Sequence, residues 1–123
     1  MKVLALDYGS ARTGIAVSDP TGTLARPLDV VSRVGTKAGF ARLQEIVERE
    51  APERVVVGLP LTLRGEHGAQ AQETDRFVER LRTVVRCPVE MFDERFTSTL
   101  SGGDDAGAAA HLLSDYLEWM RRA

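Results

Sequence analysis

The chain has 123 residues, 43% of them hydrophobic, and a formal net charge of −2, which fits one globular domain over residues 1–123 and excludes a disordered chain. This small negative charge gives no general attraction to nucleic acid. A nucleic-acid partner would have to be held by local basic groups or by bridging metal ions. The sequence has no leader or membrane-length apolar run, and its single cysteine, Cys87, has no internal disulfide partner; we therefore expect a reduced, cytoplasmic protein.

The first part of the chain predicts three strands. Residues 2–7 contain the continuous apolar run VLAL, which is typical of a central strand covered on both faces. Residues 13–18 are expected to pair with it as a hairpin. Residues 24–32 contain Pro27 and suit an edge strand. Three antiparallel strands therefore open the predicted fold.

The rest of the chain predicts alternating helices and strands. A helix starts near Thr36, an N-cap candidate, and a β-branched strand follows at residues 54–59. A second helix is expected over residues 66–85, a fifth strand over residues 88–92, and a last helix from about Asp105. Right-handed crossovers then give an α/β fold with a five-stranded mixed sheet in the order 3-2-1-4-5, flanked by helices.

Acidic residues fall where predicted elements begin or end. Asp7 closes the first strand, Asp93 and Glu94 follow the fifth, and Asp104 and Asp105 open the last helix. Ligands of open α/β sheets bind at the carboxyl ends of the strands, so we expect these carboxylates to meet. Converging carboxylates repel one another unless divalent cations neutralise them, and oxygen ligands suit Mg²⁺ or Mn²⁺ better than Zn²⁺. Paired ions of this kind can cleave phosphodiester bonds.

Each of these acids also has a structural explanation. Asp7 can cap its turn, the acids after the fifth strand can pair with Arg95, and those at the last helix can cap it. Acids at two strand ends and at a helix start nevertheless favour one shared site.

Four segments follow one another along the chain: LDYGSARTGIAVSDP, VVGLPLTLRGEHGAQA, VEMFDERFTS and DAGAAAHLL. Together they resemble the YqgF/RuvX family, which has an RNase H-like fold and is described as Holliday junction resolvases and pre-ribosomal RNA nucleases. The resemblance implies a metal-dependent endonuclease that hydrolyses phosphodiester bonds in branched DNA, in precursor 16S ribosomal RNA, or in both. Such an enzyme would act in DNA recombination and repair or in ribosome biogenesis.

The resemblance also implies a set of metal ligands. Asp7 would be the ligand from the first strand, Asp93 or Glu94 the second acid, and Asp105 the third, holding Mg²⁺ or Mn²⁺. Adjacent residues of a strand point to opposite faces, so Asp93 and Glu94 are not expected to contact the same ion directly. The sequence leaves the choice between them open.

Residues that suit phosphate oxygens lie near these acids. Guanidinium and hydroxyl groups donate hydrogen bonds to phosphates, and glycines let a nucleic-acid backbone approach closely. For Arg64, which stands where the family often carries an acid, a solvent-exposed loop position is an equal alternative. The predicted substrate-binding residues are Gly9, Ser10, Arg12, Arg64, Arg95, Thr97 and Ser98.

The chain departs from the family before its last helix. Family members carry a helix and a stretch rich in Lys and Arg there, whereas only residues 99–104 intervene in this chain. The departure weakens a grip on a four-way junction and makes Asp104 a substitute candidate for Asp105. The oligomeric state stays open: a two-fold homodimer would favour junction cleavage and a monomer would favour RNA processing.

Two other functions compete with the nuclease. One is a nucleic-acid-binding or transcription-associated module that keeps the fold without cleavage. The other is nucleotide binding, because the turn from Asp7 to Thr13 also resembles the phosphate loop of actin-like ATPases and sugar kinases. Those enzymes close two such domains over a nucleotide, and this chain supplies one.

Overall fold

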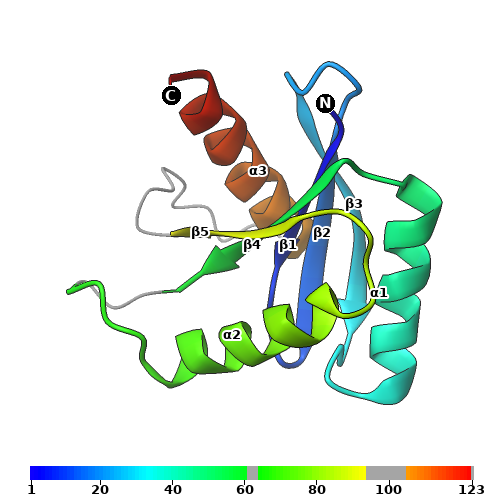
Figure 1. The fold of residues 1–123 in the computed structure, drawn as a ribbon, viewed down its shortest axis with the longest axis vertical. Helices are drawn as coiled ribbons and strands as arrows, with labels where there is room; N and C mark the ends of the chain where they lie inside the picture. Colours follow the sequence, from blue (N-terminus) through cyan, green and yellow to red (C-terminus); the bar gives the residue numbers. More distant parts are fainter. Residues whose placement is uncertain (61–63, 94–104, 123) are drawn as a thin grey trace.

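The computed structural model describes residues 1–60, 64–93 and 105–122. The elements follow one another as the sequence predicts, three strands first and then helices alternating with strands (Figure 1). They are β1 (Val3–Asp7), β2 (Arg12–Ser18), β3 (Ala25–Ser32), α1 (Lys37–Glu50), β4 (Arg54–Leu59), α2 (Ala69–Arg82), β5 (Val89–Asp93) and α3 (Asp105–Arg122).

The five strands form one mixed sheet in the order β3-β2-β1-β4-β5, which confirms the predicted order. β1 pairs antiparallel with β2, and β2 pairs antiparallel with β3. β1 and β4 run parallel, as do β4 and β5. The carboxyl ends of β1, β4 and β5 therefore lie at the same edge of the sheet.

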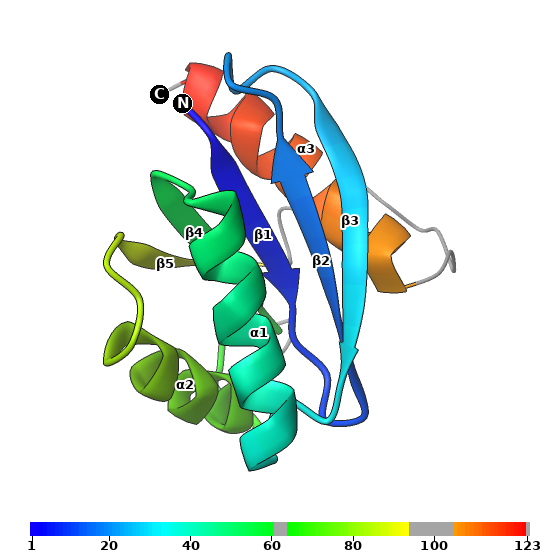
Figure 2. The ribbon, with the colours of Figure 1, turned by 90° about the vertical axis from the view of Figure 1, so that its right-hand side faces the viewer.

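Helices cover both faces of this sheet (Figure 2). α1 and α2 lie on one face, and α3 lies on the other. β1 serves both layers: Leu4 and Leu6 belong to the core under α1 and α2, whereas Val3 and Ala5 belong to the core under α3. The continuous apolar run of β1 is the pattern that burial on both faces requires.

The first helix begins where its cap residue predicts. The Thr36 hydroxyl accepts a hydrogen bond from the Gly39 backbone N–H at 3.1 Å, which satisfies one of the donors at the start of α1. The helix ends at Glu50, and its C-cap, Ala51, takes up a left-handed backbone conformation with φ 47°.

The second helix is shorter than predicted. It begins at Ala69 and ends at Arg82, whereas the sequence pattern indicates residues 66–85. Gly65 has a φ of 81°, which lies outside the helical range, and Gly68 is the N-cap without a side-chain hydrogen bond. Two glycines within four residues lower the helix propensity there, and that effect outweighs the polar and apolar periodicity.

The last helix is anchored to the sheet toward its carboxyl end. The Tyr116 hydroxyl accepts a hydrogen bond from Arg54 at 2.8 Å and donates one to Glu90 at 2.5 Å. Tyr116 is 1% exposed, and its ring meets Phe92 edge-on at 5.5 Å between centroids.

Among the described residues, no helix is long and apolar enough to cross a membrane.

The first residue of α3 lies directly against β2. A Cβ atom added to Gly14 would lie 1.8 Å from the backbone carbonyl oxygen of Asp105, far inside van der Waals contact. A residue with a side chain at this position would therefore push the start of α3 away from the sheet. Glycine here is a packing requirement, because it lets two backbones touch.

Replacement of Gly14 by alanine should therefore destabilise the protein by about 1 to 3 kcal/mol, the usual cost of overpacking a closely packed site. Urea denaturation gives the free energy of unfolding directly. Gly35→Ala is the matched control, because a Cβ atom at Gly35 would meet no atom within 4 Å. Equal stability of the two variants would contradict the close contact.

Candidate active site

Asp7 and Asp105 lie on the same face of the sheet, at the same end. Asp7 is the last residue of β1 and stands directly opposite Gly14 on β2. Directly paired residues of antiparallel strands project to the same side, and Gly14 faces the Asp105 backbone. Asp7 and the first residue of α3, which are 98 positions apart in the sequence (105 − 7), are therefore brought to the same part of the sheet.

An arginine forms an ion pair with Asp105. The Arg12 Nε atom donates to the Asp105 Oδ2 atom at 2.8 Å. Their side chains are 65% and 41% exposed respectively, so the pair is accessible to solvent and to ligands. Arg12 is the first residue of β2, and its backbone pairs with Ser32 of β3.

The turn that connects β1 to β2 is held closely by its own backbone. A Cβ atom on Gly9 would lie 2.4 Å from the Arg12 carbonyl oxygen, so the turn can close only with glycine there. The buried Thr13 hydroxyl donates to the Gly9 carbonyl oxygen at 3.2 Å. The Arg33 backbone N–H donates to the Ala11 carbonyl oxygen at 2.9 Å. Ser10 is exposed at the tip.

Tyr8 ties the same turn to α2, a role that the sequence pattern did not reveal. Its hydroxyl donates to a Glu73 carboxylate oxygen at 2.8 Å, and its ring stacks on Phe77 with 4.6 Å between centroids. Burial, followed by the hydrogen bond to Glu73, raises the pKa of Tyr8 to about 12. The aromatic residue between Asp7 and Gly9 was the only local signal of this contact.

The acid that ends β5, Asp93, is directed to the other side of the sheet from Asp7. Phe92 packs in the core under α3, so strand alternation places Asp93 on the opposite face from Asp7. Glu94 and Asp104 lie outside the described residues, as do the predicted phosphate contacts Arg95, Thr97 and Ser98.

Arg64 is exposed in the turn that leads into α2, after the carboxyl end of β4. Its exposed position agrees with both interpretations of this residue, a phosphate contact and a solvated loop arginine.

The donor chemistry of this end fits Mg²⁺ or Mn²⁺. Asp7 and Asp105 offer carboxylate oxygens, which are the ligands that these ions prefer. Within the ranges 1–60, 64–93 and 105–122, no three His, Cys, Asp or Glu side chains gather closely enough to hold a metal by themselves. Two carboxylates with water and phosphate oxygens are a common ligand set for Mg²⁺.

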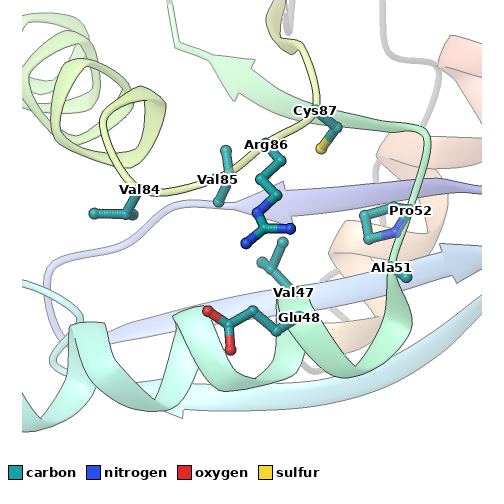
Figure 3. Close-up of a pocket in the computed structure, with 8 residues that line it drawn as sticks. All are labelled: Val47, Glu48, Ala51, Pro52, Val84, Val85, Arg86 and Cys87. Atoms are coloured by element: carbon teal, nitrogen blue, oxygen red, sulfur yellow. The ribbon is translucent and has the colours of Figure 1, made fainter.

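A surface pocket of about 540 Å³ lies at the other end of the sheet, between the end of α1 and the segment that connects α2 to β5 (Figure 3). Pro52 precedes β4 and Cys87 precedes β5, whereas Asp7 and Asp93 close their strands. Burial raises the pKa of the Cys87 thiol. The pocket is therefore separate from the acidic end. Its lining residues are Val47, Glu48, Ala51, Pro52, Val84, Val85, Arg86 and Cys87.

Sequence comparison relates almost the whole chain to known proteins. The model of the RuvX family, described as "Holliday junction resolvase", matches residues 1–119. A Chloroflexus aggregans protein named "Putative pre-16S rRNA nuclease" is 40% identical over 134 positions, covering 97% of this chain and 94% of the relative. A Syntrophomonas wolfei protein of the same name is 35% identical and covers 96% of this chain and 94% of the relative.

Comparison with solved structures shows the fold. Thermus thermophilus RuvC, solved in complex with a Holliday junction substrate, superposes with a TM-score of 0.70 at 19% identity, over 99% of this chain and 96% of that chain. This likeness confirms the predicted RNase H-like fold. A ROK hexokinase from the same organism has a TM-score of 0.52 at 24% identity, and this chain spans only 39% of its length. The second likeness is one of fold alone.

Replacing Tyr8 by phenylalanine should lower the stability by about 1 to 2 kcal/mol, because the stacking on Phe77 remains while the hydrogen bond to the Glu73 carboxylate is lost. A double-mutant cycle with Glu73→Ala, which removes the acceptor, isolates the interaction between the two side chains. Equal stability of the wild type and Tyr8→Phe at neutral pH would contradict the contact.

The same hydrogen bond has a pH signature. The folded protein holds the Tyr8 phenol proton more tightly than the unfolded chain, because the pKa rises from 10.0 to about 12. The stabilisation by Tyr8 is thus complete below pH 10 and is lost as the pH rises toward 12. Unfolding curves of the wild type and Tyr8→Phe should therefore converge over that range.

Proposed function

Because the chain belongs to the RuvX family, we propose that it is a metal-dependent endonuclease that hydrolyses phosphodiester bonds in precursor 16S ribosomal RNA. The observation that carries this proposal is the meeting of Asp7 and Asp105 on one face of the sheet, beside Arg12. Carboxylates gathered beside a guanidinium suit the binding of divalent ions and phosphates together.

Asp7, Asp105 and one acid from the segment after β5 would hold Mg²⁺ or Mn²⁺. When bound, such ions supply an activated water and neutralise the charge that develops on the phosphate oxygens. The chain's own groups position the substrate. Arg12 donates hydrogen bonds to phosphate oxygens, the Ser10 hydroxyl adds another donor, and the close turn at Gly9 lets the nucleic-acid backbone approach.

Of the two adjacent acids after Phe92, we propose Glu94 as the metal ligand. Asp93 lies on the face opposite Asp7 because Phe92 packs under α3. Because side chains alternate along a strand, Asp93 is directed away from Asp7, and this leaves Glu94 as the candidate ligand of the two. Asp93 would then serve the structure at the end of β5, where it stands opposite Leu59.

Ribosomal RNA is preferred as the substrate on two grounds. The relatives that share 35% to 40% of their residues over nearly the whole chain carry the pre-16S rRNA nuclease name. The 40% match extends over 134 positions although this chain has 123 residues, so that relative contains residues that this chain lacks. A shorter protein with few basic residues before α3 offers less surface for a four-way junction.

Cleavage assays test the proposal. Asp7→Asn and Asp105→Asn should each lower the rate at least about a hundredfold, because each removes a ligand charge while conserving side-chain shape. A precursor 16S rRNA fragment and a four-way DNA junction should be compared, with Mg²⁺, with Mn²⁺ and with EDTA. EDTA should abolish cleavage.

Asp29→Asn is the matched control for the two aspartate variants. Asp29 forms an exposed ion pair with Arg42 on β3 and α1, and the change should leave the rate unchanged. Undiminished cleavage in both site variants would refute the nuclease mechanism. If the wild type bound nucleic acid but cleaved none, the result would instead support the nucleic-acid-binding module. If it cleaved the four-way junction faster than the RNA, the junction would be the preferred substrate.

The two adjacent acids can be separated in the same assay. Glu94→Gln should lose activity as severely as Asp7→Asn, about a hundredfold, whereas Asp93→Asn should retain most of the rate. The assignment rests on the face to which Phe92 points. The reverse result would mean that the strand loses its alternation at Asp93 and that this residue is the ligand.

A further inference from the structure

The ion pair between Arg12 and Asp105 occupies the carboxylate that the proposed nuclease needs for its metal. Arg12 Nε donates to Asp105 Oδ2 at 2.8 Å. A guanidinium has five N–H donors, and this contact uses the one on Nε. The same arginine is therefore placed both to hold the acid and to reach a phosphate.

We propose that Arg12 is an exchangeable counter-ion: it neutralises Asp105 in the metal-free protein, is displaced when a divalent cation binds, and then binds the phosphate of the nucleic acid. This inference rests on the proposed function of the site. A guanidinium and a divalent cation a few ångströms apart repel each other, so the two compete for Asp105. A nucleic-acid phosphate then offers the displaced guanidinium a new anionic partner.

The local structure permits this exchange without a change in the backbone. Arg12 is anchored by its pairing with Ser32, and the next residue, Thr13, is completely buried. The Arg12 side chain is nevertheless 65% exposed, and that of Asp105 is 41% exposed. An exposed ion pair is weak, so its replacement by a stronger charge interaction costs little. The guanidinium can thus move while its strand stays in place.

The affinity for the metal distinguishes the proposed exchange from an alternative in which Arg12 only orients Asp105. If Arg12 only oriented Asp105 for the metal, its removal would weaken metal binding. If Arg12 competes with the metal, its removal should strengthen metal binding and should at the same time weaken nucleic-acid binding. The two explanations therefore predict metal affinities that change in opposite directions.

Titration calorimetry with Mn²⁺ and the 123-residue chain provides the test. Arg12→Gln should bind Mn²⁺ about two- to fivefold more tightly than the wild type, the range expected when an exposed ion pair no longer competes. Arg12→Ala should give the same result, and it excludes a new hydrogen bond from the glutamine to Asp105. Fluorescence anisotropy with a labelled precursor rRNA fragment in Ca²⁺ should show weaker RNA binding by both variants.

Arg42→Gln is the matched control. Arg42 forms an exposed ion pair with Asp29 at 3.1 Å, with side-chain exposures of 47% and 34%. Arg42 belongs to α1, so the same charge is removed on the opposite face of the sheet from α3. This variant should bind Mn²⁺ like the wild type. Thermal unfolding of all variants without metal should confirm that each is folded.

Two failures can be told apart. Tighter Mn²⁺ binding by both Arg12 variants, together with weaker RNA binding, supports the exchange. Unchanged or weaker Mn²⁺ binding by these variants, with a wild type that binds Mn²⁺ through Asp7 and Asp105, overturns the exchange and leaves the proposed nuclease intact. Absence of Mn²⁺ binding by the wild type overturns the metal-dependent nuclease and the exchange together.

Discussion

The direct backbone contact between Gly14 and Asp105 is the constraint on which the acidic end depends. Gly14 belongs to a strand that pairs with β1, and Asp105 begins α3. Without a side chain at Gly14, the first turn of α3 can rest on the sheet, which brings Asp105 to the same face and the same end as Asp7. The helix is fixed again through Tyr116, so its orientation across the sheet is determined from two points.

Two carboxylates on one face of the sheet concentrate negative charge there, and a nearby residue of the chain supplies a positive charge. Arg12 stands at the start of β2, one turn of chain after Asp7, and contacts Asp105 at 2.8 Å. The turn between them is closed by Gly9 and tied to α2 through Tyr8. The acidic pair, its counter-charge and the turn therefore form one connected unit on a rigid sheet, the arrangement that a metal-binding or phosphate-binding site requires.

The sheet order and the position of Asp7 at the end of β1 could be predicted because they depend on local patterns and on the handedness of crossovers, which a single sequence reveals. The start of α2 could not be predicted in this way. The low helix propensity of Gly65 and Gly68 delays the helix, although the helical periodicity of the sequence continues through both residues. The contacts of Arg12 and Tyr8 join residues 93 and 65 positions apart, and no local pattern encodes such pairs. Alternation predicted that Asp93 and Glu94 face opposite sides, but only the packing of Phe92 identifies the side that Asp93 faces.

The pocket beside Cys87 has a practical consequence for experiments on this protein. The chain contains a single cysteine, and it lies before β5, at the opposite end of the parallel strands from Asp7. A fluorophore or spin label attached to that thiol would report on conformational change without entering the acidic end. Because burial raises the thiol pKa, the thiolate needed for attachment forms only at more alkaline pH, and labelling should be carried out there.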